Sequence, residues 1–503
     1  MKMKILITSF FMSVGLIVSA QLQNALISIQ TEEEVLGMSV VTLCGGEVDQ
    51  VHHLGLKDVT RDLPVDNNTM FRVASVSKLV TAMALMKLYD QGLFGLDDDV
   101  STALGWNLRN PNYPNTPITY RMLLSHTSSL QDGDGYGDFL EVTFQSLPFP
   151  PNISDLLIPL GVFYSTNMFR VEQPGTFFTY SNINYGVIGT LIEKWSKQRF
   201  DTYVKQNILT PMGITGSYNV TDLSDINDLA VIYRYVNGWV PQVDNFQGVA
   251  PTPLDFSSYT PGINGLVFGP QGGLRISALD LAKVMKVHLN NGLYEGNQIL
   301  SSSAIQLMHA PEWSYNGANG DNFYGLFREW GLGLQRTTNA PFGDIVFPEV
   351  YMMGHAGEAY GLISDFYFDP ISGSGIILAI NGIRGGYEYG ESSAFYKVEE
   401  KIFDAAHDHS YLICTANVKE NKEQYTLQVY PNPATDIIYL RSTSLVSPKI
   451  IKVHDASGRL VYEQAMNSGA IMSVDVSSWA GGFYQVEAFY NNVIFHGWFE
   501  VIP

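Results

Sequence analysis

The stretch from Ser75 to Gly92 reads SVSKLVTAMALMKLYDQG and predicts a buried helix. Its apolar side chains recur at steps of three and four residues, as they do on the buried face of an α-helix, and they are Leu79, Ala82, Met83, Met86 and Tyr89. Gly92 can supply the left-handed residue that often ends such a helix. The sequence therefore places Ser75 and Lys78 at the start of one helix.

Ser75 and Lys78 form a Ser-x-x-Lys pattern, and this spacing puts both side chains on one face of the helix. A serine hydroxyl becomes a good nucleophile only when a base takes its proton, and a lysine can be that base if burial or nearby cations lower its pKa. The pattern alone is weak, because it occurs about once by chance in a chain of average composition. A solvated Lys78 is the ordinary alternative.

Two further motifs follow in the chain. Tyr180, Ser181 and Asn182 come after a turn-rich stretch at 173–176, and His355, Ala356 and Gly357 precede an alternating apolar stretch that predicts a strand at 362–368. Two flanking segments accompany them, LLSHTSSL at 123–130 and GGL at 272–274. In order and spacing these motifs resemble the serine β-lactamase and penicillin-binding-protein superfamily, in its branch of class C β-lactamases, DD-carboxypeptidases and related esterases, over roughly residues 30 to 405.

The resemblance implies a role for each motif residue. Ser75 would be the acylating nucleophile, Lys78 its base or proton partner, and Tyr180 the phenol that carries protons to the leaving group. Asn182 would orient Lys78 and bind a substrate amide or carbonyl, and His355 would take the place that Lys or His holds in the third motif. The oxyanion hole would come from the backbone N–H groups of Ser75 and of Glu358, which follows Gly357.

Each assignment has a structural alternative. Tyr180 could be a core tyrosine, His355 a structural histidine, and Asn182 the cap of the helix that follows it. Ser125 and His126 are better explained as structural residues than as catalytic ones.

The third motif departs from the family pattern at two positions. Ala356 lacks the hydroxyl with which many members hold the substrate carboxylate, and His355 replaces a lysine and is largely neutral at neutral pH. Both changes weaken carboxylate recognition. The sequence therefore favours a serine hydrolase that cleaves an ester or amide, as an esterase or D-amino-acid peptidase does. The alternatives are a β-lactamase or DD-carboxypeptidase and, in another class, a non-catalytic module that binds peptidoglycan or β-lactams.

The first residues have the parts of a secretory signal peptide. Residues 1–4 contain two lysines, residues 5–18 form a mainly apolar stretch, and Ser19 and Ala20 lead to an expected cleavage after Ala20. The apolar stretch is shorter than a bilayer-spanning helix, and no second candidate follows, so we expect no transmembrane segment in the mature chain. The expected location is outside the cell, either secreted or attached to the outer surface.

Composition narrows the possible partners. Only 16% of the residues are charged and 46% are hydrophobic, which is typical of a folded, globular chain. The formal net charge is -20, with 29 Lys plus Arg against 49 Asp plus Glu, so a nucleic-acid partner is not expected. No His or Cys spacing indicates a metal, and we expect no cofactor. Whether Cys44 and Cys414 pair is open from the sequence.

Strand and helix patterns predict an α+β fold for residues 25–408. The expected strands lie at 40–44, 51–56, 362–368 and 375–379, and the expected helices at 75–91, 118–124, 184–198, 278–290 and 393–406. This order predicts a β-lactamase-like domain, an antiparallel sheet flanked by helices with a helical subdomain. The polar residues 409–423 are interpreted as a linker.

Residues 424–503 are strand-like throughout and predict a small all-β sandwich. The segment YPNPA at 430–434, the turn at 455–458 and the segment GGFY at 481–484 resemble the C-terminal sorting domain of the type IX secretion system. The resemblance implies that the type IX machinery is a partner, besides a small-molecule or peptide substrate. A carbohydrate-binding or adhesion sandwich is the alternative. The sequence does not tell whether this domain is cleaved.

Overall fold

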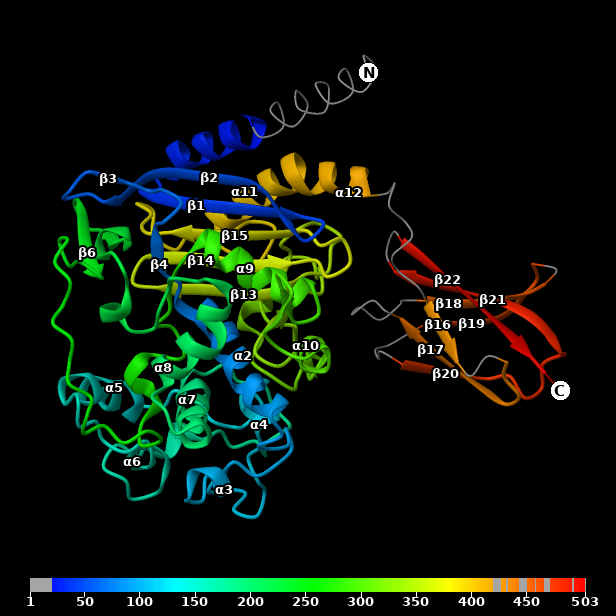
Figure 1. Ribbon diagram of the computed structural model, residues 1–503, viewed down its shortest axis with the longest axis horizontal. Coiled ribbons are helices and arrows are strands. Elements are labelled where there is room, and N and C mark those ends of the chain that lie inside the picture. Colours follow the sequence, from blue (N-terminus) through cyan, green and yellow to red (C-terminus); the bar gives the residue numbers. More distant parts are fainter. Residues whose placement is uncertain are drawn as a thin grey trace. The chain divides into compact units, whose positions relative to one another are not determined.

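The computed structural model describes residues 20–418, 427–430, 433–442, 450–456, 458–465, 471–490 and 493–502 (Figure 1). The expected signal peptide lies outside the described residues, apart from Ala20. The chain divides into two compact units, with the boundary on the C-terminal side at residues 413 and 414. We describe each unit by itself.

The large unit is built on an antiparallel sheet of nine strands in the order β10-β11-β12-β13-β14-β15-β1-β2-β3. Their bounds are β10 Trp313–Ser314, β11 Glu329–Trp330, β12 Gln335–Arg336, β13 Met353–Ala359, β14 Leu362–Phe368, β15 Gly375–Ile380, β1 Gly37–Cys44, β2 Glu47–Asp58 and β3 Leu63–Pro64. An early and a late segment of the large unit thus meet in this sheet, where β1 pairs with β15.

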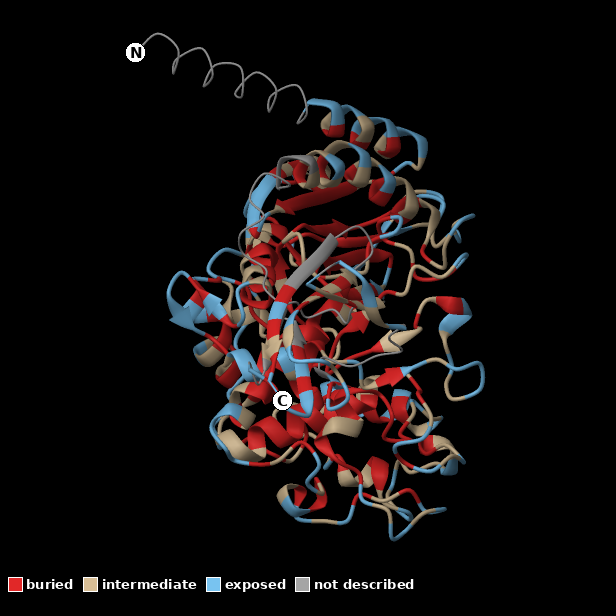
Figure 2. Cartoon of the chain, turned by 90° about the vertical axis from the view of Figure 1, so that its right-hand side faces the viewer, coloured by how far each residue is buried: buried red, intermediate tan, exposed pale blue. Residues whose placement is uncertain are grey.

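The central strands are buried on both faces because their side chains alternate between two hydrophobic cores (Figure 2). In β15, Ile377 and Ala379 enter one core, whereas Ile376, Leu378 and Ile380 enter the other. The helix at 20–32 and α11 (Lys397–Ala406) cover the second face, while α2 (Ser77–Asp90) and α9 (Ala278–Leu289) lie on the first (Figure 1). The sheet is therefore the middle of three layers.

The remaining elements of the large unit are mostly short. The helices are α3 Ser101–Leu104, α4 Tyr120–Leu124, α5 Gly135–Gln145, α6 Ser154–Leu157, α7 Asn182–Ser196, α8 Phe200–Val204 and α10 Ser302–His309. Three two-stranded pairs join them, formed by β4 (Met70–Arg72) with β7 (Arg275–Ser277), β5 (Ile232–Tyr235) with β6 (Trp239–Val243), and β8 (Leu293–Tyr294) with β9 (Asn297–Gln298). Helices α3 to α8 form the helical subdomain below the sheet in Figure 1.

The predicted fold class is confirmed, and most predicted elements occur within a few residues of their expected bounds. Ser277 caps α9 as expected, its side chain accepting a hydrogen bond from the Asp280 N–H.

The structure differs from the prediction at the expected linker 409–423. The chain there remains helical, as a π-helix at His407–Tyr411 and then α12 (Leu412–Val418), and residues 419–426 lie outside the described residues. Cys44 and Cys414 are both disulfide-bonded.

The small unit contains two antiparallel sheets. One has the order β16-β17-β20 and the other β19-β18-β21-β22. Their bounds are β16 Leu427–Tyr430, β17 Ile437–Ser442, β18 Ile450–Asp455, β19 Leu460–Ala465, β20 Ile471–Asp475, β21 Gly482–Tyr490 and β22 Val493–Val501. Alternate residues such as Ile438, Val453 and Val486 fill the core between the sheets. This is the all-β arrangement that the strand-like pattern predicts.

Gly333 lies between β11 and β12 and packs against Ala82 of α2. Its φ is +84°, and a Cβ at this position would overlap the Cβ of Ala82. We therefore expect Gly333→Ala to destabilise the chain by about 2 to 4 kcal/mol, from backbone strain and overpacking together. Gly296 has a similar φ of +82° with nothing within 4 Å. Gly296→Ala is therefore the control for backbone strain alone, with an expected loss of about 1 kcal/mol in the free energy of unfolding. Urea unfolding measures the loss in each variant. Equal costs in the two variants would contradict the packing argument.

Candidate active site

Ser75 lies in a tight turn at the entrance to the central helix. The turn is the 3₁₀ segment η1 (Ala74–Val76), and α2 begins at Ser77 rather than at Ser75 as predicted. Ala74 has a φ of +42°, an uncommon conformation for a residue with a side chain. Helix α2 is buried from Ser77 to Met86, so it holds the turn on a rigid support. The nucleophile predicted from the sequence is therefore at the end of a fixed element.

Lys78 contacts Ser75 directly. Its Nζ donates hydrogen bonds to Ser75 Oγ at 3.0 Å, to Asn182 Oδ1 at 2.9 Å and to the backbone oxygen of Gln271 at 2.8 Å. The side chain is fully buried. Burial lowers the pKa of Lys78 to about 7, although the negative charge of Asp132 acts in the opposite direction. An amine with this pKa is partly neutral at neutral pH and can accept a proton from Ser75.

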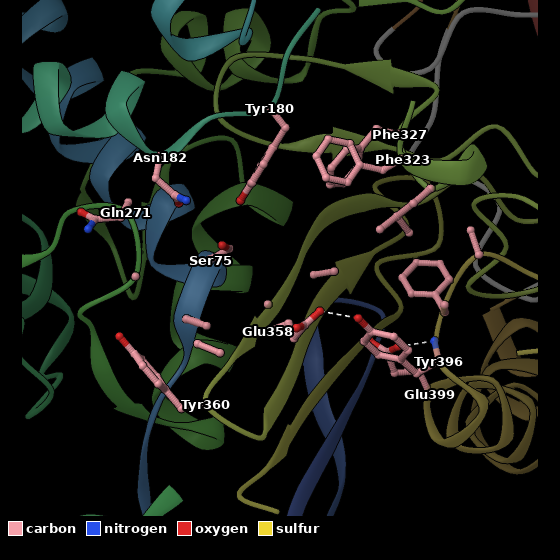
Figure 3. Close-up of a pocket in the computed structure, with 18 of the residues that line it drawn as sticks. Ser75, Tyr180, Asn182, Gln271, Phe323, Phe327, Glu358, Tyr360, Tyr396 and Glu399 are labelled. Carbon is pink, nitrogen blue, oxygen red and sulfur yellow. Dashed lines mark hydrogen bonds between the residues drawn. The ribbon is translucent and has the colours of Figure 1, made fainter. Parts of the chain in front are cut away.

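Tyr180 lies on the other side of the nucleophile, with its hydroxyl toward Ser75 in Figure 3. The Lys78 ammonium is 4.9 Å from the centre of its ring. Burial raises the pKa of the Tyr180 hydroxyl above its usual value, and the hydrogen bond with Ser75 offsets only part of this rise. The phenol is therefore protonated at neutral pH. Between the two candidate bases, Lys78 is the group that can accept the serine proton.

Asn182 begins α7 and is held by Asp132, a residue to which the sequence analysis gave no role. The Asp132 carboxylate accepts hydrogen bonds from the Asn182 side chain at 2.8 Å and from the N–H groups of Asn182 and Ile183 at 3.0 and 2.9 Å. It thereby neutralises the positive end of α7 and turns Asn182 Oδ1 toward Lys78. Local sequence gives no sign of this contact, because Asp132 is 50 residues from its partner.

The third motif lies on β13, where neighbouring side chains point to opposite faces. Ala356 and Glu358 line the pocket in front of Ser75. Gly357 lies against the nucleophile turn, since a Cβ there would be 3.2 Å from Ser75 N and 2.8 Å from the backbone oxygen of Val73. The hydroxyl of Ser364 donates to the same Val73 oxygen at 2.9 Å and joins β14 to the turn.

His355, which the resemblance groups with the substrate and oxyanion residues of the third motif, is buried beside Tyr180. Its ring is buried between Tyr180 and Trp330, with centroids 5.9 and 5.3 Å away, and it does not line the pocket. Nδ1 bonds the Ala356 oxygen at 2.6 Å. Burial lowers the pKa of His355 to about 3, so the ring is neutral. The strand alternation that brings Ala356 and Glu358 to the pocket turns His355 away from it.

His126 is structural, as expected. Its Nδ1 accepts a hydrogen bond from the Ser181 N–H at 3.2 Å, and its ring packs 4.6 Å from that of Tyr180. Burial lowers its pKa well below the usual value. The neutral His126 ring therefore holds Ser181 by a hydrogen bond and packs against the ring of Tyr180.

A pocket of about 600 Å³ opens in front of these groups. Ser75, Tyr180 and Asn182 line one side (Figure 3). Much of the remaining lining is aromatic and comprises Tyr136, Phe323, Tyr324, Phe327, Tyr360, Tyr389, Phe395 and Tyr396. The sequence could not identify most of these side chains, because they come from segments far apart in the chain that only the fold brings together.

Comparison with known proteins identifies the family of the chain. A protein-family model described as Beta-lactamase matches residues 22–389, which include every group named above except Phe395 and Tyr396. The chain belongs to the Beta-lactamase family. The model of a secretion system C-terminal sorting domain matches residues 428–493, and such a domain indicates export to the cell surface by the type IX system. No helix in the described parts of the chain has the length and hydrophobicity needed to cross a membrane.

Relatives in the Beta-lactamase family are distant in sequence. Penicillin-binding protein 4* of Bacillus subtilis (strain 168) is 29% identical over 252 residues, which are 48% of this chain and about half (52%) of that protein. Penicillin-binding protein 4 of Amycolatopsis lactamdurans is 23% identical over 369 residues, 72% of this chain and 84% of that one.

Solved structures show the same fold. The octameric penicillin-binding protein homologue from Pyrococcus abyssi superimposes with a TM-score of 0.56 and 20% identity, covering 96% of each chain. The D-amino acid amidase from Ochrobactrum anthropi SV3 does so with a TM-score of 0.55 and 19% identity, over 80% of this chain and 99% of that one.

The pKa of Lys78 predicts how acylation of Ser75 depends on pH. The rate should rise tenfold per pH unit below about 7 and level off above it, because only the neutral amine accepts the proton. The negative charge of Asp132 raises this pKa, so Asp132→Asn should move the rise to lower pH. Asp134→Asn removes a nearby exposed charge and serves as the control. The measurement is the rate of Ser75 labelling by a fluorophosphonate between pH 5 and 9. Identical profiles for the two variants would contradict the role of Asp132.

Proposed function

We propose that the chain is an exported serine hydrolase that cleaves an ester or amide through an acyl-enzyme on Ser75. The observation that carries the proposal is the 3.0 Å hydrogen bond between Ser75 Oγ and the fully buried Lys78 amine. A lysine whose pKa is about 7 can take the serine proton without an additional base. A non-catalytic binding module would not need this arrangement.

The reaction has two halves. Lys78 takes the proton of Ser75 as Oγ attacks the substrate carbonyl, and Tyr180 passes a proton to the leaving group as its bond to the carbonyl breaks. Lys78 then restores the proton of Tyr180. In the second half a water attacks the acyl carbonyl and gives its proton to the same pair. The pair returns this proton to Ser75 Oγ as the acyl C–O bond breaks and the carboxylic acid leaves. Tyr180 acts as a neutral donor here because burial disfavours its phenolate.

The backbone N–H groups of Ser75 and Glu358 are the proposed donors to the carbonyl oxygen. The close approach of Gly357 to the Ser75 amide supports this assignment, since it sets the two backbone segments side by side. Asn182 would accept or donate a hydrogen bond to the substrate from the opposite side of the pocket.

The lining of the pocket favours substrates without a carboxylate beside the scissile bond. Ala356 offers no hydroxyl, His355 is neutral and turned away, and Glu358 places a carboxyl group on the same wall. An esterase or D-amino-acid peptidase activity is therefore the first choice. A β-lactamase or DD-carboxypeptidase activity is second, and the two penicillin-binding proteins among the relatives favour it.

Export completes the proposal. The basic and apolar start at residues 1–20 would direct the chain to the inner-membrane export pathway. The sorting domain would then bring it to the type IX machinery and to the cell surface, where the substrate is encountered.

Labelling with a fluorophosphonate tests the nucleophile. Mass spectrometry of the mature protein should place one adduct on Ser75, and Ser75→Ala should carry none. Lys78→Met should label at least a hundredfold more slowly, because the serine loses its base. Folded protein without an adduct would favour the binding-module alternative.

Substrate preference tests the reaction class. The value of kcat/KM for a short-chain 4-nitrophenyl ester should exceed that for a chromogenic cephalosporin, whose carboxylate meets Glu358 and no compensating cation on that wall. Ser75→Ala supplies the background hydrolysis of each reagent. Faster turnover of the cephalosporin would reverse the order of the two candidate activities.

A further inference from the structure

One wall of the catalytic pocket carries two carboxyl groups. Glu358 comes from β13 and Glu399 from the first turn of α11, and both line the pocket that contains Ser75. Tyr396 joins them, since its hydroxyl donates to Glu358 and its backbone N–H donates to Glu399 at 2.6 Å (Figure 3). These contacts fix the positions of both carboxyl groups and leave their charge without a cation.

A third carboxyl group, that of Asp365, lies behind this wall. Asp365 is completely buried and faces Glu399, and neither of its oxygens has a further hydrogen-bond partner among the described residues. Burial raises the pKa of both groups, and their proximity raises that of Asp365 further, so the pair holds a shared proton. Glu358 is the carboxyl group of the wall that lies outside this pair.

No basic residue of the described chain forms an ion pair with Glu358 or Glu399. Two cations belong to the site: Lys78, which is buried and bonded to Ser75 Oγ, and Arg72, which lines the pocket. The Arg72 guanidinium bonds the Gly272 oxygen at 3.2 Å and lies 5.2 Å from the centre of the Tyr360 ring. In Figure 3, Tyr360 lies to the lower left of Ser75 and Tyr396 to its lower right. The acidic groups and Arg72 thus come from different segments of the pocket lining.

Aromatic rings surround the acidic end. The rings of Tyr389 and Tyr396 are 5.6 Å apart, and Tyr324 lies 6.3 Å from Tyr389. Tyr324 and Tyr389 are 87% and 65% exposed, so their faces are free to meet a ligand. Carboxylates next to tyrosine faces are a favourable environment for an organic ammonium group, which both kinds of group attract.

We propose that this acidic, tyrosine-lined end of the pocket binds an ammonium group of the substrate, so that the preferred ester or amide carries an organic cation near its scissile carbonyl. The inference rests on the proposed function, because it concerns the pocket of the same nucleophile. The inference defines the substrate class as esters or amides that carry a positive charge. Glu358 is the main specificity-determining residue, since its side chain is the exposed carboxylate of the wall.

The test uses pairs of reagents with the same shape and different charge. Acetylthiocholine and S-3,3-dimethylbutyl thioacetate differ only in a cationic or neutral leaving group. The 4-nitrophenyl esters of 4-(trimethylammonio)butanoate and 5,5-dimethylhexanoate differ in the acyl group. In at least one pair, kcat/KM should be roughly tenfold higher for the cation, the size expected for a charge pair near a protein surface.

Charge-neutral variants assign the preference to the wall. Glu358→Gln should reduce the cation-to-neutral ratio to below about threefold, as the lost charge pair requires. Glu391→Gln removes an exposed carboxylate of the neighbouring loop that does not line the pocket, and it should keep the wild-type ratio. Ratios near one in both pairs for the wild-type protein, or a ratio that Glu358→Gln leaves unchanged, would overturn the proposal.

A binding measurement separates this inference from the proposed function. Calorimetric titration of the Ser75→Ala protein should show acetylcholine binding more tightly than 3,3-dimethylbutyl acetate, and Glu358→Gln in the same background should remove the difference. Cation binding without turnover or labelling would contradict the hydrolase proposal alone. Labelling and turnover of neutral esters without any cation preference would contradict the ammonium site alone.

Discussion

The active centre depends on one constraint, the complete burial of the Lys78 amine. A charged ammonium in this position is destabilised by the loss of its hydration, and its hydrogen-bond acceptors are two neutral oxygens and the serine hydroxyl. The neutral amine is therefore a populated state at neutral pH. The surrounding architecture maintains this condition: α2 is buried in the unit, and the second motif and the Gln271 loop close over the amine.

The remaining residues near Lys78 adjust this balance. Asp132 holds the amide of Asn182 and supplies a negative charge at a distance, while the neutral rings of His126 and His355 add no charge of their own. The two buried histidines thus pack against Tyr180 and form hydrogen bonds to the backbone. Because their pKa values are lowered, they do not compete with Lys78 for the proton of Ser75. Lys78 is therefore the proposed base of this site, and the two neutral imidazoles contribute to the packing around Tyr180.

Sequence patterns predicted most of the frame. The helical period after Ser75, the strand alternation at 362–368 and the cap at Ser277 are local signals, and the structure agrees with them to within a few residues. The motif order then identified Ser75, Lys78, Tyr180 and Asn182, which the structure brings together. Asp132, Glu399 and the pocket tyrosines other than Tyr180 had no comparable signal, because their function depends on contacts between distant segments. Position in a motif was also insufficient for His355, whose direction depends on the register of β13.

Strand β13 explains why catalysis and substrate choice can change separately in this fold. At Gly357 the strand needs a residue without a side chain, since any Cβ would press on the nucleophile turn. At Ala356 and Glu358 the side chains face the pocket, contact the substrate region and leave the serine-lysine pair untouched. A substitution at these two positions alters the charge and shape of one wall without disturbing the proton transfer behind it. The acidic wall is therefore compatible with an intact catalytic centre. It affects which esters or amides bind beside Ser75.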